Sequence, residues 1–161
     1  MTSQYRSALS GEDIVQFIDR CGEALDALAP FLDDLNALGG SDFDTGANAA
    51  RSFAAVKRLM RRSREEVDSA STFLQALTVY ARAGSAGHVG ILITSIIAAL
   101  SSATSANEVR PIDMRAFLAS LPNALEDAFS TPAPELMEMA TAARAVALDT
   151  PDPIDAAHMM V

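Results

Sequence analysis

Two aspartates, two positions apart, are the residues of this sequence best suited to chemistry. Asp42 and Asp44 lie in a turn that follows Gly39-Gly40 and precedes a helical pattern. Carboxylates this close repel each other unless a cation lies between them. Hard cations such as Mg²⁺ prefer carboxylate oxygens and keep other coordination positions for water or phosphate. The free N–H groups of the following helix would favour a bound anion, so the turn predicts metal and phosphate binding together.

The same turn is open to other interpretations. Asp and Thr are common in turns and helix caps, so Thr45 and Asn48 could serve only to begin the next helix. The Asp-Thr-Gly-Ala string that starts at Asp44 also matches retroviral-type aspartic proteases. Those enzymes need apolar strands around the string and a second such aspartate, whereas the flanks here are glycine-rich and helical. An EF-hand starting at Asp42 would need Gly at its sixth position and Glu at its twelfth, but Ala and Phe stand there.

Composition limits the class of protein. The 161 residues fit one domain, 1–161, half of them are apolar and Trp is absent, which favours packed helices. A net charge of −9 argues against nucleic acid as a partner. The single cysteine, Cys21, excludes an intramolecular disulfide and suits a reducing, cytoplasmic compartment. The apolar run Val89–Leu100 is too short for a membrane span, which needs about 20 residues, so no membrane association is expected.

Hydrophobic spacing predicts an all-α protein, an antiparallel bundle of about six amphipathic helices. The first expected helix runs from Ser10 to near Pro30, and the residues after Pro30 could add one more turn. The second runs from Thr45 or Gly46 to the basic cluster 57–64, and the third from Glu65 to Arg82. The last three are expected from His88 to Ser101, from Pro111 across Pro122 to Phe129, and from Glu135 to Leu148. The fourth is apolar nearly all round and is expected at the centre. Residues 1–10 and 149–161 are expected to be loosely held.

The predicted inner face of the first helix is Ile14, Phe17, Ile18, Cys21, Leu25 and Leu28. Apolar residues at this spacing fall on one side of a helix, which normally faces the core. The sixth helix has a thin apolar face, which leaves surface for a partner or for a second copy in a homodimer.

The stretch Leu35–Asn48 resembles the metal-binding loop of the dihydroxyacetone kinase L-subunit (DhaL) family, which includes the nucleotide-binding domain of bacterial fatty-acid kinases. The usual string there is Asn or Asp, a short gap, then Asp-Gly-Asp-Thr/His-Gly-x-Asn. The spacing from Asn36 to Asp42 is that of the fatty-acid kinase branch. The likeness continues through Arg51–Val56 and a small-residue loop before an apolar helix, and covers roughly residues 12 to 148.

The resemblance implies a DhaL-like bundle in which Mg²⁺ grips the phosphates of ATP or ADP for phosphoryl transfer to small hydroxy-ketone or acyl acceptors. By carry-over, the metal ligands are Asn36, Asp42 and Asp44, and the nucleotide-binding residues are Thr45, Asn48, Gly84, Ser85 and Gly87. No catalytic residue is assigned, and the phosphoryl acceptor is expected on a protein partner.

Two departures from the family keep a second function open. Phe43 stands where the family has a tiny residue, and the last helices of the family, which close over the nucleotide, are expected to be lacking. The alternative is a catalytically degenerate relative that acts as a regulatory or protein-interaction module. The basic cluster from Lys57 to Arg64 is either a site for an anionic partner or a solvated helix end.

Overall fold

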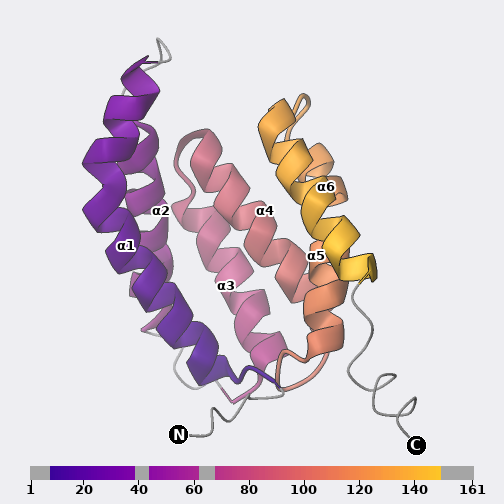
Figure 1. Ribbon diagram of the computed structural model, residues 1–161. Helices are drawn as coiled ribbons and strands as arrows, with labels where there is room; N and C mark the ends of the chain where they lie inside the picture. The colour runs from indigo at the N-terminus through magenta and orange to yellow at the C-terminus, as the bar shows by residue number, and fades with distance from the viewer. Residues whose placement is uncertain (1–7, 39–43, 62–67, 150–161) are drawn as a thin grey trace, which may run out of the picture.

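Six helices follow one another along the described chain and alternate in direction (Figure 1). The structure is a computed structural model that describes residues 8–38, 44–61 and 68–149, without the side chains of Asn36 and Leu59. The helices are α1 (Gly11–Leu38), α2 (Thr45–Met60), α3 (Ala70–Gly84), α4 (Gly87–Ala103), α5 (Pro111–Ala128) and α6 (Pro134–Asp149). Within these residues there is no strand, so the prediction of an all-α bundle is confirmed.

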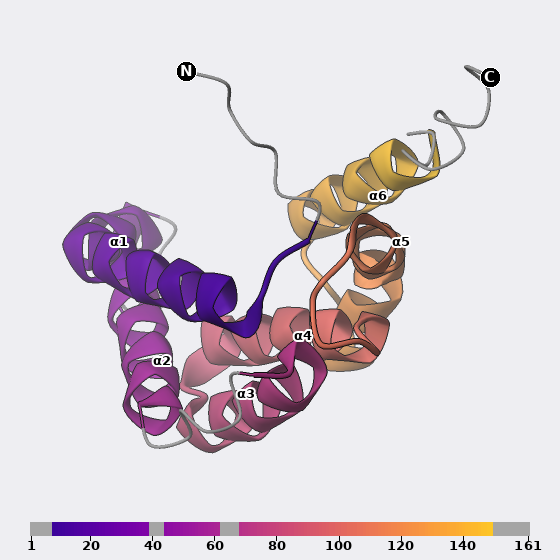
Figure 2. The same ribbon diagram turned by 90° about the horizontal axis from the view of Figure 1, so that it is seen from below.

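Seen from below, the helices form an arc with α1 and α6 at its two ends (Figure 2). Each helix packs against the next, and α2 also contacts α4. α4, which was expected at the centre, packs against α2, α3 and α5. Its outer side is nevertheless open, because Ile91 and Ile96 are more than a third exposed.

The core lies between α1, α2 and α3, with contributions from α4. Its largest members are Phe73, Leu74, Leu77 and Val56, each at most 1% exposed. Ile14 and Ile18 of α1 pack into the same cluster. Burial of such side chains stabilises a fold by roughly 1.5–3 kcal/mol each before entropic costs.

Helix α1 departs from prediction in two ways. It continues through Pro30 to Leu38, although a proline removes one backbone hydrogen bond and usually ends or kinks a helix. Phe17 and Leu28, predicted to face inward, are 65% and 49% exposed. The reason is that α2 packs along only one flank of α1.

The connections at the end of the bundle where α1 begins are fixed by backbone and capping hydrogen bonds. Leu9 and Val109 exchange two backbone hydrogen bonds of 2.9 and 2.8 Å, so part of the segment expected to be loose is held. Ser69 caps α3, which begins at Ala70. The expected start near Glu65 was too early, because Asp68 and Ser69 precede the helix. Helix α5 runs unbroken across Pro122, as predicted.

The ends 1–7 and 150–161 lie outside the described residues. None of the helices described here is both long and apolar enough to cross a membrane.

Candidate functional site

Helices α2, α4 and α6 all begin at one end of the bundle, where α1, α3 and α5 end (Figure 1). This follows from the alternation of direction along the chain. The acidic turn precedes α2, and the glycine loop predicted to face a nucleotide precedes α4. The fold therefore gathers both predicted segments at the same end, which we call the upper end.

The first turn of α2 is capped by a carboxylate from α1. Oδ1 of Asp33 accepts hydrogen bonds from the backbone N–H groups of Gly46, at 2.6 Å, and Ala47, at 3.2 Å. Gly46 permits this contact, because a Cβ there would overlap the carbonyl oxygen of Ala29. The sequence suggested that these N–H groups face a bound anion, but in the structure the protein's own carboxylate already occupies them.

The loop between α3 and α4 lies directly on α2. The N–H of Ala86 donates to Oγ of Ser52 at 3.1 Å, and the Ser52 hydroxyl donates to the carbonyl of Asn48 at 2.8 Å. A Cβ on Gly84 would overlap that of Ala55, so only glycine allows the helices to come this close.

Gly87, the first residue of α4, meets the side chain of Asn48. Its φ of +60° is a left-handed conformation that favours glycine. A Cβ there would lie 2.7 Å from Nδ2 of Asn48, which is a buried residue only 8% exposed. Two residues predicted to contact one ligand, 39 positions apart in the sequence, are thus neighbours in space.

The orientation of the Asn48 amide is set by Arg51. Nη2 of Arg51 donates to Oδ1 of Asn48 at 2.9 Å. Because a guanidinium can only donate hydrogen bonds, the amide oxygen must face Arg51, and the amide nitrogen then faces Gly87. The N-cap of α4, Ala86, supplies no side-chain cap, and no other described side chain bonds to the first N–H groups of α4, which lie beside this amide. Such a group of donors suits an acceptor-rich or anionic ligand.

The remaining predicted residues are only partly described. Asp44 directly precedes α2, and its carbonyl accepts from the N–H of Asn48 at 2.8 Å. Thr45 begins α2, and Ser85 lies exposed between α3 and α4. Asp42 and the side chain of Asn36 lie outside the described residues. The described residues alone contain no group of three or more His, Cys, Asp or Glu residues suited to a metal.

Three residues of this site were not predicted as such. Asp33 belongs to no recognisable motif, and Ser52 lies inside the likeness but was given no role. The contacts of Asp33 with α2 and of Ser52 with Ala86 are made only by helix packing. Arg51 lies within the segment that resembles the family. Its contact with Asn48 could have been predicted, because residues three apart are neighbours on a helix.

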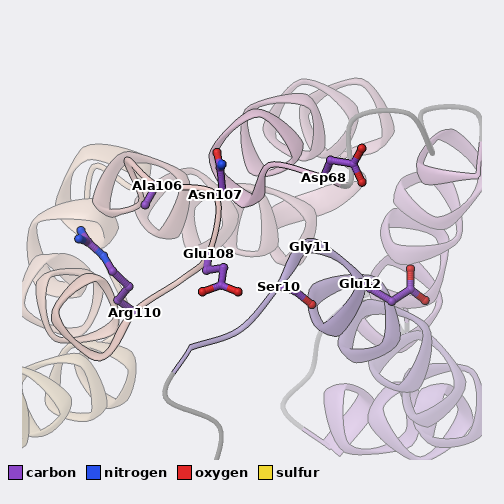
Figure 3. A pocket seen from close by; sticks show the side chains of 8 residues that line it. All are labelled: Ser10, Gly11, Glu12, Asp68, Ala106, Asn107, Glu108 and Arg110. Carbon is purple, nitrogen blue, oxygen red and sulfur yellow. The ribbon is translucent and has the colours of Figure 1, made fainter.

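A separate hollow lies at the opposite, lower end of the bundle (Figure 3). It has a volume of about 640 Å³, and its lining includes the acidic side chains Glu12, Asp68 and Glu108. Arg110, its one basic residue, is paired with Asp113 at 3.0 Å and points away from Glu108 in Figure 3. An anionic ligand would be repelled there.

The basic cluster lies only in part within the described residues. Lys57 is paired with Asp19 of α1 at 3.4 Å, while residues 62–64 lie outside the described part of the chain. Burial raises the pKa of the Cys21 thiol, which lowers its reactivity as a nucleophile.

Comparisons with known proteins give no match. The chain matches no family model, no curated protein and no solved structure.

Proposed function

We propose that the upper end of the bundle binds the phosphates of a Mg²⁺–nucleotide, ATP or ADP, for phosphoryl transfer of the dihydroxyacetone kinase L-subunit or fatty-acid kinase type. The observation that supports this most is the contact between Asn48 and Gly87. The sequence resemblance assigns both residues to one ligand, and their proximity supports a common binding position for it.

The geometry favours the start of α4 over the start of α2 for the phosphates. The first N–H groups of α2 are bonded to Asp33, whereas the described residues provide no side-chain cap for those of α4. A phosphate at α4 would also meet the Asn48 amide nitrogen. In phosphoryl transfer the protein mainly positions phosphates and neutralises their charge. Asp42 and Asp44, with Asn36, would hold the metal, and a protein partner would carry the acceptor.

The second candidate is a relative that has lost catalysis and acts as a regulatory or interaction module. Asp33 favours it, because a carboxylate at the start of α2 repels a phosphate that approaches the same turn.

Calorimetric titration with MgADP separates the two functions. We expect heat of binding from the intact protein and its loss in the Asp42→Ala/Asp44→Ala variant. Asn48→Asp keeps the side-chain size but replaces the donor with a carboxylate, so it should weaken binding by at least about tenfold. Asn123→Asp makes the same charge change on an exposed position of α5 and serves as the matched control.

No heat from the intact protein would refute nucleotide binding and leave the interaction module. Equal affinities of the Asn48→Asp and Asn123→Asp proteins would instead remove the start of α4 as the phosphate position.

A further inference from the structure

Helix α1 carries a row of apolar residues at alternating spacings of three and four. Its members, here called the α1 seam, are Ile14, Phe17, Cys21, Ala24, Leu28, Phe31, Leu35 and Leu38. This period of 3.5 residues is the heptad pattern by which one helix packs against another in a coiled coil.

Most of the α1 seam is open to solvent. The exposed fractions are 65% for Phe17, 49% for Leu28, 58% for Phe31, 47% for Leu35 and 85% for Leu38. The helix packs through Ile14 at the lower end of the seam and through the neighbouring row, in which Ile18 is only 5% exposed and Leu25 and Leu32 are half-buried. A contiguous exposed apolar row of this kind marks an interaction surface.

The upper end of α1 extends beyond its neighbour. Because Asp33 caps the first turn of α2, the residues after it lie past the start of that helix. Figure 1 shows this end of α1 projecting above the other helices. The last turn also holds no basic residue, so the negative end of the helix dipole is unbalanced by its own side chains.

The charges beside the seam disfavour a second copy as the occupant. The flanking row is Asp13, Arg20, Ala27 and Asp34. Consider an antiparallel pair of α1 helices in which every seam residue packs against a seam residue of the other copy. Asp13 would then face Asp34 and Arg20 would face Ala27. Two carboxylates would therefore meet at each end of the pair. A parallel pair would set this row against Ile18, Leu25 and Leu32, which already pack within the protein. The net charge of −9 adds repulsion between copies.

We infer that the α1 seam binds a helix of another protein that has its own apolar heptad seam and basic flanks. Lysine or arginine on that helix would lie beside Asp34 and the carbonyl end of α1. From Phe17 to Leu38 the surface is about 30 Å long, which fits a partner helix of roughly 20 residues. The inference does not depend on nucleotide binding.

The test uses two synthetic 21-residue helices with leucine at every seam position, one flanked by lysine and one by glutamate. Fluorescence anisotropy measures the binding of each labelled peptide to the intact protein. We expect the lysine peptide to bind at least about tenfold more tightly than the glutamate peptide, with weaker binding as salt is raised.

Variants then locate the contact. Phe31→Ser/Leu35→Ser removes two exposed apolar side chains of the seam and should lower the affinity for the lysine peptide by at least about tenfold. Met139→Ser/Leu148→Ser changes two exposed apolar residues of α6, at 70% and 65%, and should leave binding unchanged. Asp34→Lys should lower the preference for the lysine peptide. Circular dichroism verifies that each variant is folded.

Three outcomes would overturn the inference. The lysine peptide could bind the seam and α6 variants equally well, or the two peptides could bind the intact protein alike. The third is a dimer in light scattering that the Phe31→Ser/Leu35→Ser change dissociates, which would make a second copy the occupant.

Discussion

The first four helices and the last two are held in place in different ways. Around α2 and α3, large side chains such as Phe73 and Leu77 are completely buried. In α5 and α6 the buried residues are Asp113, Pro122, Leu125, Ala140 and Ala147. The comparison shows that the C-terminal hairpin depends on close alanine contacts and one capping carboxylate, whereas the N-terminal part depends on a closed apolar core.

The largest expected effect tests the core side of this comparison. Leu77→Ala should lower the free energy of unfolding by about 2–5 kcal/mol, because a fully buried leucine leaves a cavity. The matched change Leu136→Ala, at a half-buried position of α6, should cost about 1 kcal/mol. Urea denaturation followed by circular dichroism measures both, and equal losses would contradict the contrast between the two parts.

An intermediate effect is expected at the start of α5. Asp113 accepts from the N–H of Arg110 at 2.9 Å and from its guanidinium at 3.0 Å. These bonds hold the pKa of Asp113 below its ordinary value of 3.8. Asp113→Asn should cost about 1–2 kcal/mol of stability at pH 7, the usual size for a lost charged cap.

The pH dependence of that variant has a fixed sign. Since the folded-state pKa is lowered, the carboxylate stabilises the protein above pH 3.8 and loses this contribution as pH falls through the lower folded-state value. The stability difference between wild type and Asp113→Asn should therefore shrink below about pH 4. Asp127→Asn, an exposed carboxylate on the same helix, is the control and should show little difference at any pH.

The smallest effect is expected on the outer face of α6. Met139 is 70% exposed, so Met139→Gln should change the free energy of unfolding by less than about 0.5 kcal/mol. Thermal unfolding measures this change. A loss above about 1 kcal/mol would mean that this face is covered in solution, and the hairpin would then need a partner to be stable.

Local pattern predicted the later helices best. The expected bounds of α4 and α6 lie within two residues of those observed, because glycine, proline and polar connectors frame both helices. The course of α1 past Pro30 was not predictable in the same way, since propensity alone favours a break there. The contacts of α2 with Ala29 and Asp33 help to hold the helix across that proline.

The candidate site was predictable only as two separate motifs. The sequence marked Asn48 and the loop Gly84–Gly87, but not the bonds that join them. Asp33 precedes its bonded partner Gly46 by 13 residues. Such a contact depends on the antiparallel packing of α1 and α2, and no periodicity in the sequence encodes it.

By itself, the sequence determined the helical class, the number of helices and most of their ends, because hydrophobic period, glycine and proline act locally. The tertiary structure alone decided which apolar rows are buried and which helix starts receive a cap from a described side chain. Both depend on how far each helix overlaps its neighbours. Thus Phe17 and Phe31 remain exposed on α1, and Asp33 caps the start of α2, whereas no side chain among the described residues caps the start of α4.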